Sequence, residues 1–261
     1  MDKDKLTSHL QGEREQTIGS MVLDAAKIAW NTNRPQVTNF YDPYEQTVAR
    51  SVLSGLPELN VLTFGGYRQA ERARLVIVPH FFITEAIESP ITVLQATGNF
   101  NFNKVKHGDF LGSLLGLGIK REKVGDIIVL ENGCQVVVAQ EIANYVMQNW
   151  LQVHRVTIAV EEIDPEQIAI EPERVKEIRT TVASLRLDAV AASGYGTSRT
   201  KIVRDIKGER VKLNWKTVTN PSAEVKEGDT LSIRGRGRVI VEEVKGETRK
   251  GRISLVLKRL I

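Results

Sequence analysis

The stretch 185-LRLDAVAASGYGTSRTKIVRDIKGERVKLNWK-216 decides how the C-terminal part of this chain folds. The apolar spacing of its first ten residues is typical of a short helix, which Gly194 would end. A second helix follows, with Thr197 or Ser198 as its N-cap and an apolar side around Ile202. A strand, a polar turn and a returning strand complete the stretch. It therefore predicts two helices followed by a β-hairpin.

The second predicted helix also carries cations away from its apolar side. Because successive helical residues are rotated by about 100°, Lys201, Arg204 and Lys207 fall within a sector of about 120°. A phosphate backbone is bound by several cations that a rigid frame holds at successive phosphates. A solvated helix face is the alternative for any one of these residues, and it is weaker for the set.

Charge is divided unevenly along the chain. Of its 36 Lys+Arg and 32 Asp+Glu, residues 181–261 contain 18 and 9, which leaves 18 and 23 for residues 1–180. The total of +4 therefore combines a net charge of +9 at the C-terminal end with −5 in the rest of the chain. This asymmetry favours a polyanionic partner such as a nucleic acid over a merely solvated basic surface.

Residues 1–82 are predicted to form an N-terminal mixed α/β unit. Apolar residues at three- and four-residue spacings indicate a helix over 6–30. Asp42 and Pro43 then offer an N-cap and a first helical position for a second helix, which runs to about Leu53. Residues 61–64 and 75–78 are typical of strands.

Residues 83–170 are predicted to form a central ferredoxin-like domain. Strands are expected at 91–94, 127–130, 135–138 and 155–160, with helices over 110–115, capped by Asp109, and over 140–150. The order β-α-β-β-α-β is the split βαβ pattern, which hosts many unrelated functions. The aromatic signature of a base-stacking RNA-recognition sheet is absent from the likely central strands.

A linker is expected at 171–181, because residues 164–173 are acidic and contain two prolines. Residues 182–261 then form the basic C-terminal domain, with a β extension at its end. The whole chain is predicted to be an α+β protein.

Composition excludes several classes of protein. Apolar residues make up 41% of the 261, no tract suits a bilayer span, and the N-terminus lacks a targeting pattern, so we expect a cytoplasmic protein without membrane insertion. Cys134 is the only cysteine and the four histidines are scattered, so neither a disulfide nor a metal site is expected. No catalytic grouping stands out, and we expect no cofactor and no small-molecule substrate.

Four ordered blocks of this C-terminal region, 185–188, 198–201, 208–214 and 225–229, resemble the S4 RNA-binding domain, named after a small-subunit ribosomal protein. In that family two short helices and the following turn bind structured RNA. The resemblance implies this role for Arg186, Ser198, Arg199, Lys201, Arg204, Lys207, Asn214 and Lys216. Arg210 adds a further cation beside the helix pair.

One residue departs from the usual pattern of the S4 domain. The turn often reads Asn-Gly-Lys, whereas here it is Asn214-Trp215-Lys216. Trp215 is an RNA-binding candidate that would stack on a base, or else it covers the turn.

The resemblance extends over nearly the whole chain. Residues 107–127, HGDFLGSLLGLGIKREKVGDI, and residues 40–46, FYDPYEQ, are similar to segments of the YlmH family, which the Asn-Trp-Lys turn also fits. This resemblance implies binding of ribosomal RNA and tRNA on the ribosome, at the large subunit with a peptidyl-tRNA, as in bacterial ribosome-associated quality control. The chain is also similar to a branch in oxygenic phototrophs that is labelled a photosystem II S4 domain protein.

Two further basic segments are secondary RNA-binding candidates. Lys120, Arg121 and Lys123 form a predicted loop that either contacts RNA or is a plain surface loop. Arg236 and Arg238 lie in a glycine-rich segment that is flexible or forms a strand with a bend. The glycines at 108, 112, 116 and 118 lack the ending of a P-loop and are expected to serve packing and capping.

The leading hypothesis is a non-enzymatic factor that binds structured RNA. The main rival is a pseudouridine synthase, because such enzymes carry S4 domains and a catalytic aspartate in an Arg-Leu-Asp motif, as at residues 186–188. Here that motif lies inside the predicted RNA-binding helix, so Asp188 is expected to be structural. A third hypothesis is a regulatory or assembly factor of photosynthesis that binds RNA.

Overall fold

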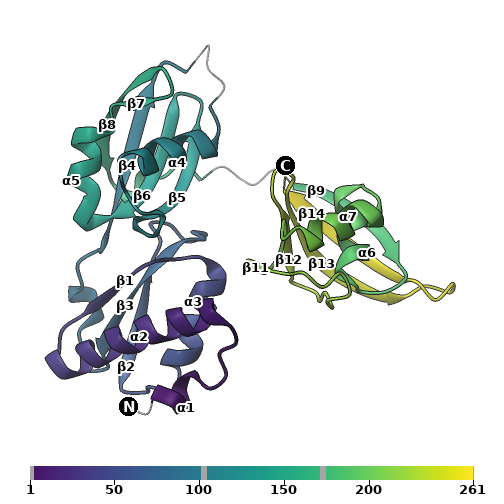
Figure 1. The fold of residues 1–261 in the computed structure, drawn as a ribbon. Coiled ribbons are helices and arrows are strands. Elements are labelled where there is room, and N and C mark those ends of the chain that lie inside the picture. The colour runs from purple at the N-terminus through teal and green to yellow at the C-terminus, as the bar shows by residue number, and fades with distance from the viewer. Residues whose placement is uncertain (1–2, 101–104, 171–174, 261) are drawn as a thin grey trace. The chain divides into compact units, whose positions relative to one another are not determined.

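The computed structural model describes residues 3–100, 105–170 and 175–260, and the chain divides into two compact units, Met1–Ile170 and Glu171–Ile261 (Figure 1). The first unit contains a three-stranded and a five-stranded sheet, and the second contains a six-stranded sheet. Helices and strands are both abundant, which confirms the α+β class.

The first part of unit Met1–Ile170 is a three-stranded antiparallel sheet under two helices. Its strands β1 (Gln36–Tyr41), β2 (Leu59–Phe64) and β3 (Ala73–Pro79) lie in the order β1-β3-β2. The helices α2 (Glu13–Thr32) and α3 (Pro43–Leu53) pack on the sheet through a shared apolar core. A short helix, α1 (Lys3–Thr7), precedes them.

The predicted start of α3 is confirmed in detail. The backbone N–H of Glu45 donates to Asp42 Oδ1 over 2.9 Å, and that of Asp42 donates to Glu45 Oε2 over 2.8 Å, which forms a capping box. The single helix predicted over 6–30 is wrong, because the chain breaks near Gly12, whose φ is +86°, and forms α1 and α2.

Strand β1 was not predicted, since polar residues interrupt its apolar pattern. The polar residue Thr38 is buried and bonded instead. Its hydroxyl oxygen accepts from the backbone N–H of Leu75 over 2.9 Å. A buried threonine that pairs with the neighbouring strand explains why the segment is a strand without apolar alternation.

The second part of this unit is a five-stranded antiparallel sheet with helices packed on one face. Its strands lie in the order β5-β6-β4-β8-β7. In chain order the elements are β4 (Ile91–Gly98), α4 (His107–Gly116), β5 (Val124–Leu130), β6 (Gly133–Ala139), α5 (Gln140–Asn149), β7 (Gln152–Val153) and β8 (Val156–Ile163). Apart from the two-residue β7, this is the predicted ferredoxin-like arrangement.

Single-turn 3-10 helices lie at η1 (Thr84–Ala86), η2 (Arg121–Lys123) and η3 (Pro165–Gln167). One detail of α4 differs from prediction. Asp109 does not cap the helix but lies within its first turn, where Oδ2 accepts from the backbone N–H of Lys106 over 2.7 Å.

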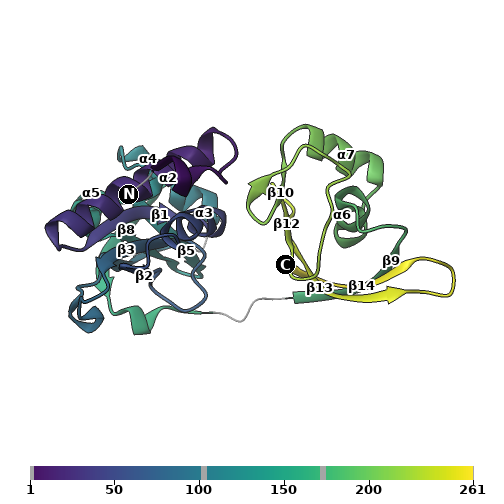
Figure 2. The same ribbon diagram turned by 90° about the horizontal axis from the view of Figure 1, so that it is seen from below.

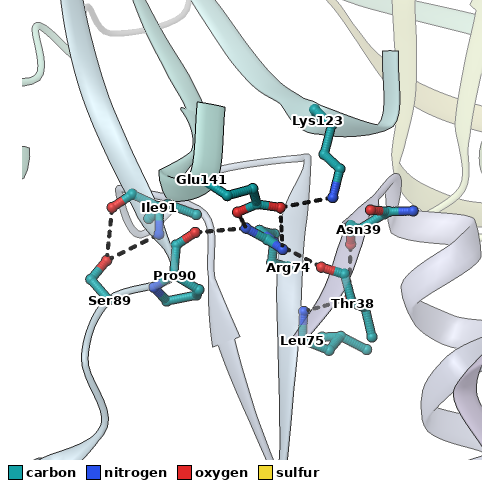
Figure 3. A network of polar contacts seen from close by, with 9 residues as sticks. All are labelled: Thr38, Asn39, Arg74, Leu75, Ser89, Pro90, Ile91, Lys123 and Glu141. Carbon is teal, nitrogen blue, oxygen red and sulfur yellow. Dashed lines mark hydrogen bonds and ion pairs between the residues drawn. The ribbon is translucent and has the colours of Figure 1, made fainter. Parts of the chain in front are cut away.

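A buried arginine joins the two sheets of this unit (Figure 3). Arg74 on β3 donates from Nε to the carbonyl oxygen of Thr38 over 2.7 Å and from Nη1 to that of Pro90 over 2.8 Å. Its guanidinium also binds both carboxylate oxygens of Glu141 on α5, at 2.7 and 3.1 Å, and Lys123 binds the same carboxylate. One side chain thus connects β1, β3, α5 and the segment that leads into β4.

Asp126 on β5 makes a second connection. It accepts hydrogen bonds from the hydroxyl of Tyr67 over 2.9 Å and from the backbone N–H groups of Glu71 and Arg72 over 2.7 and 3.1 Å. The predicted boundary at residue 82 therefore lies inside one compact unit, and the three-part division of the chain stays a prediction.

The C-terminal unit is a six-stranded sheet in the order β11-β10-β12-β13-β14-β9, with neighbouring strands antiparallel. Two helices, α6 (Leu187–Tyr195) and α7 (Arg199–Lys207), bury their apolar sides in one core with it. Figure 2 shows both helices on the same side of β13 and β14. The strands are β9 (Val175–Val182), β10 (Val211–Leu213), β11 (Lys216–Thr217), β12 (Thr230–Ile233), β13 (Gly237–Glu247) and β14 (Ile253–Leu260).

Strand β9 occupies most of the segment that was expected to be a linker. It pairs along its whole length with β14, from Val175↔Leu260 to Val182↔Ile253. The linker prediction is wrong for these residues, because their pairing partner lies more than 70 positions later in the sequence. The first part of the expected linker, 171–174, lies outside the described residues.

The two helices begin and end close to the predicted residues. Ser198 is the N-cap of α7, and its hydroxyl oxygen accepts from the backbone N–H of Lys201 over 3.3 Å. Helix α6 does not end at Gly194 but continues to Tyr195, and Gly196, with φ +60°, is its C-cap. Gly194 is needed for packing, since a Cβ atom there would lie 2.7 Å from a methyl carbon of Val239.

We expect Glu141→Ala to destabilise unit Met1–Ile170 by about 2–3 kcal/mol, because Arg74 then carries a buried charge without a carboxylate. The value lies below that of a fully buried pair, since Glu141 is itself 45% exposed. Urea unfolding followed by tryptophan fluorescence in a Trp215→Phe background reports on Trp30 and Trp150, which belong to this unit. As a control, Glu131→Ala removes an exposed carboxylate from a turn, and equal losses for the two variants would contradict the role of Arg74.

The same carboxylate predicts how this unit responds to acid. Burial opposes ionisation of Glu141, but hydrogen bonds from Arg74 and Lys123 outweigh it and lower its pKa to about 2. A group with a lowered pKa stabilises the fold above its unfolded pKa, here about 4.3, and loses that contribution as the pH falls toward the folded value. Denaturant unfolding at pH 6 and pH 3 should show a smaller loss of stability in Glu141→Gln than in the wild type. An identical loss in the two proteins would contradict the stabilising role of the ionised Glu141 carboxylate.

Candidate nucleic-acid interface

The predicted cationic face of α7 is present. Ile202 and Ile206 are fully buried in the core of the C-terminal unit, while Lys201, Arg204 and Lys207 are exposed. None of these three side chains forms an ion pair with another described residue. The face therefore offers three positive charges, which no ion pair within the described ranges neutralises.

A buried carboxylate holds two more cations beside this helix. The Asp188 side chain is 5% exposed and binds Arg186 through both oxygens, at 3.2 Å each, and Arg199 through Oδ2 at 2.8 Å. Burial would raise the pKa of Asp188, but the hydrogen bonds from the two guanidinium groups outweigh it and lower the pKa. Both arginines remain about half exposed, so each is fixed in place and still accessible to a ligand.

A second buried carboxylate contacts two other predicted residues at different distances. Asp205 on α7 pairs with Arg236 at 3.0 Å and with Arg210 at 3.8 Å. Arg236 is 27% exposed, whereas Arg210 is 67% exposed. The short contact makes Arg236 a structural partner of Asp205, while Arg210 stays largely in solvent.

The Asn214-Trp215 turn connects β10 to β11 with φ values of +48° and +63°. Two successive residues in the left-handed region are typical of a type I′ hairpin. The Asn214 side chain donates to Asp229 Oδ1 over 2.7 Å and accepts from the backbone N–H of Thr230 over 2.9 Å. Its amide thus holds the turn against β12, and the exposed Lys216 follows it.

A groove of about 950 Å³ lies beside this turn. Lys212 on β10, Ser232 on β12 and Arg238 on β13 are directly opposite one another in the sheet, so their side chains share one face. The neighbouring strand residues Leu231, Ile233 and Val239 are buried in the core, which places this row on the other side of the sheet. The Arg238 guanidinium carbon lies 5.7 Å from the centre of the Trp215 ring system.

The groove also contains Arg234, which the sequence analysis did not select. Its backbone N–H donates to the carbonyl oxygen of Arg210 over 3.2 Å, so the two arginines lie across from each other at the end of β10 and β12. In the sequence, the alternation of residues 232, 234, 236 and 238 indicates that these side chains share one side of the segment. It cannot show which residues of other strands they lie beside. That requires the register of β10 with β12.

The three secondary candidates in the central domain differ in exposure and in their contacts. Arg121 donates to the backbone carbonyl of Gly125 over 3.3 Å, and burial together with Arg72 lowers its pKa to about 10. Lys123 pairs with Glu141 at 2.7 Å. Of the three, Lys120 alone is exposed without an ion pair to another described residue.

The glycines of the central segment do not all serve packing and capping. Gly118, with φ +82°, follows the end of α4, as a capping residue does. By contrast, a Cβ atom at Gly108, Gly112 or Gly116 would meet no described heavy atom within 4 Å beyond the adjacent residues and the backbone of the helix itself. Gly116 is the last residue of α4, which fits the predicted capping role. At Gly108 and Gly112 the described residues show no close packing that would require glycine.

The described ranges contain no cluster of three or more His, Cys, Asp or Glu side chains that could hold a metal ion. Within the same ranges, none of the helices combines the length and the apolar character of a membrane span.

Comparison with known proteins assigns three regions. Residues 14–80 match the family model "YlmH, N-terminal", residues 87–167 match "Putative RNA-binding domain in YlmH", and residues 185–231 match the S4 domain. The matched S4 region includes α6, α7 and the Trp215 turn. It ends before β13 and β14, so Arg238 lies outside it.

Similar proteins are known in two bacteria. The chain is 34% identical over 245 residues to the ribosome-associated protein quality control protein P2 of Bacillus subtilis (strain 168), and the match covers 94% of this chain and 95% of that protein. The structure of this chain is similar to that of cell division protein ylmH from Streptococcus pneumoniae, with a TM-score of 0.53 and 20% sequence identity. The match covers 61% of this chain and 98% of the Streptococcus chain. The structural likeness shows a shared fold.

We expect Asp188→Asn to destabilise unit Glu171–Ile261 by about 1–2 kcal/mol, because a neutral amide cannot balance two guanidinium groups at a buried position. The half-exposed arginines keep the loss below that of a fully buried ion pair. Thermal unfolding followed by tryptophan fluorescence in a Trp30→Phe, Trp150→Phe background, in which Trp215 is the remaining tryptophan, measures it. The exposed Glu247→Gln is the matched control. If Asp188→Asn melted with the control, the carboxylate would not be what fixes the arginines.

Proposed function

Since the chain belongs to the YlmH family, we propose that it is a non-catalytic factor that binds structured RNA on the ribosome. The single observation that carries this proposal is the set of cations around α6 and α7. Asp188 fixes Arg186 and Arg199, and the face formed by Lys201, Arg204 and Lys207 continues the positive surface along α7. Rigidly held cations bind successive phosphates without a large loss of side-chain entropy.

The relative in Bacillus subtilis supports the ribosome as the place of action, because it carries a ribosome-associated quality control name and matches nearly the whole chain. We propose ribosomal RNA of the large subunit and tRNA as the RNA partners, and the cytoplasm as the compartment. Both are structured RNAs, which the S4 domain recognises.

The absence of catalysis is part of the proposal. Asp188, the residue that resembles a pseudouridine synthase aspartate, is buried and bound by two arginines in the S4 domain. A carboxylate held in this way is a poor nucleophile, because its lone pairs are engaged. Incubation of uridine-labelled ribosomal RNA with the protein should therefore yield no pseudouridine.

Reversal of charge at Lys201 and Arg204 tests the binding face. The double variant Lys201→Glu, Arg204→Glu should bind structured RNA at least about tenfold more weakly, and the slope of log Kd against log salt should fall by about one unit per lost phosphate contact. Filter binding or fluorescence anisotropy over a series of salt concentrations measures both quantities.

The matched control is Lys27→Glu with Arg68→Glu in unit Met1–Ile170, which changes the net charge by the same amount. The control should keep the wild-type slope. Equal slopes in the test variant, the control and the wild type would show that RNA does not contact this face of α7.

A further inference from the structure

The conformation of Trp215 points to a ligand. With φ +63°, it occupies a turn position at which glycine is the relaxed residue, and a bulky side chain there carries a conformational cost. Its indole is only partly buried, so burial in the core does not explain why a tryptophan stands there. The ring instead lines the groove between β10, β12 and the start of β13.

The groove is lined mainly by basic side chains, which suit an anionic ligand. Arg210, Lys212, Arg234 and Arg238 line it, whereas Glu209 is the one acidic residue among the lining side chains in the described ranges. Arg210 is largely in solvent, and its ion pair with Asp205 is long at 3.8 Å. The charge of Arg210 is therefore available to a phosphate.

The groove also has flat surfaces on which a planar group can stack. The Arg238 guanidinium beside the Trp215 ring forms a cation–π pair, and bases stack on both kinds of surface. A base inside a double helix has neighbours on both of its faces, so only an unpaired base can reach an indole. The volume of about 950 Å³ lies within the range of sites that enclose small molecules.

We propose that this groove binds one unpaired nucleotide of the RNA ligand, with its base stacked on Trp215 and its flanking phosphates bound by Arg210 and Arg234. The inference rests on the proposed function and deepens it. The cations of α7 bind the backbone of any structured RNA, and the groove selects RNA that carries a bulged or unstacked base.

The test compares two RNA hairpins with the same stem, one fully paired and one with a single bulged adenosine. The wild-type chain should prefer the bulged hairpin by about tenfold, the effect of stacking one base on an aromatic side chain. In Trp215→Gly this preference should fall to about one, and in Trp215→Phe most of it should remain. The quantity compared is the ratio of the two affinities within each variant.

Trp215→Gly separates loss of stacking from loss of folding. Glycine is favoured at this φ, so the variant should melt at a temperature equal to or above that of the wild type. The second substitution, Arg234→Ala, removes a phosphate contact and should lower the affinity for the bulged hairpin and its salt slope, while Lys176→Ala on β9 provides the matched control.

The remaining outcomes distinguish failure of this inference from failure of the proposed function. An unchanged preference in Trp215→Gly overturns the groove assignment, as does a wild-type chain that binds both hairpins equally. A folded wild-type chain that binds neither hairpin overturns the proposed function as well. The last measurement is the affinity of the wild-type chain for free adenosine monophosphate. If it bound this nucleotide as tightly as the bulged hairpin, the ligand of the groove would be a free nucleotide and not RNA, which would overturn the proposal.

Discussion

The interaction on which the C-terminal unit depends is the pairing of the buried Asp188 carboxylate with Arg186 and Arg199. A carboxylate removed from water is stable only when cations or hydrogen-bond donors surround it, so the two arginines cannot move freely. They stand where α6 and α7 begin. A requirement of the core therefore fixes charge on the surface, and it does so before any ligand binds.

The same constraint acts in unit Met1–Ile170, with the signs exchanged. There the buried group is the cation Arg74, and carbonyl oxygens and Glu141 satisfy it. This pair joins two sheets, and Lys123 binds the same carboxylate. Burial of an ionic group thus has different consequences in the two units. The partners of Arg74 join separate elements of the fold, whereas the partners of Asp188 are cations that stay accessible on the surface.

The C-terminal sheet gives the unit a second face of different chemistry. The outer face of α7 presents cations alone, which suits an RNA backbone of any sequence. The groove by the Trp215 turn combines cations with an aromatic ring, and it uses Arg238 from β13, beyond the region that matches the S4 domain. Strands added to the S4 core therefore complete a surface that the core alone does not contain.

The sequence by itself determined the α+β class, the β-α-β-β-α-β order of elements, the Asp42 cap of α3, the Ser198 cap and the cationic face of α7. These follow from interactions between residues close in the chain, which periodicity and capping patterns record. Tertiary structure alone decided that β9 pairs with β14, that Arg234 joins the groove, and that Lys123 and Arg236 serve buried or bridging ion pairs. Each of these depends on partners far away in sequence, and a pattern of local spacing holds no information about them.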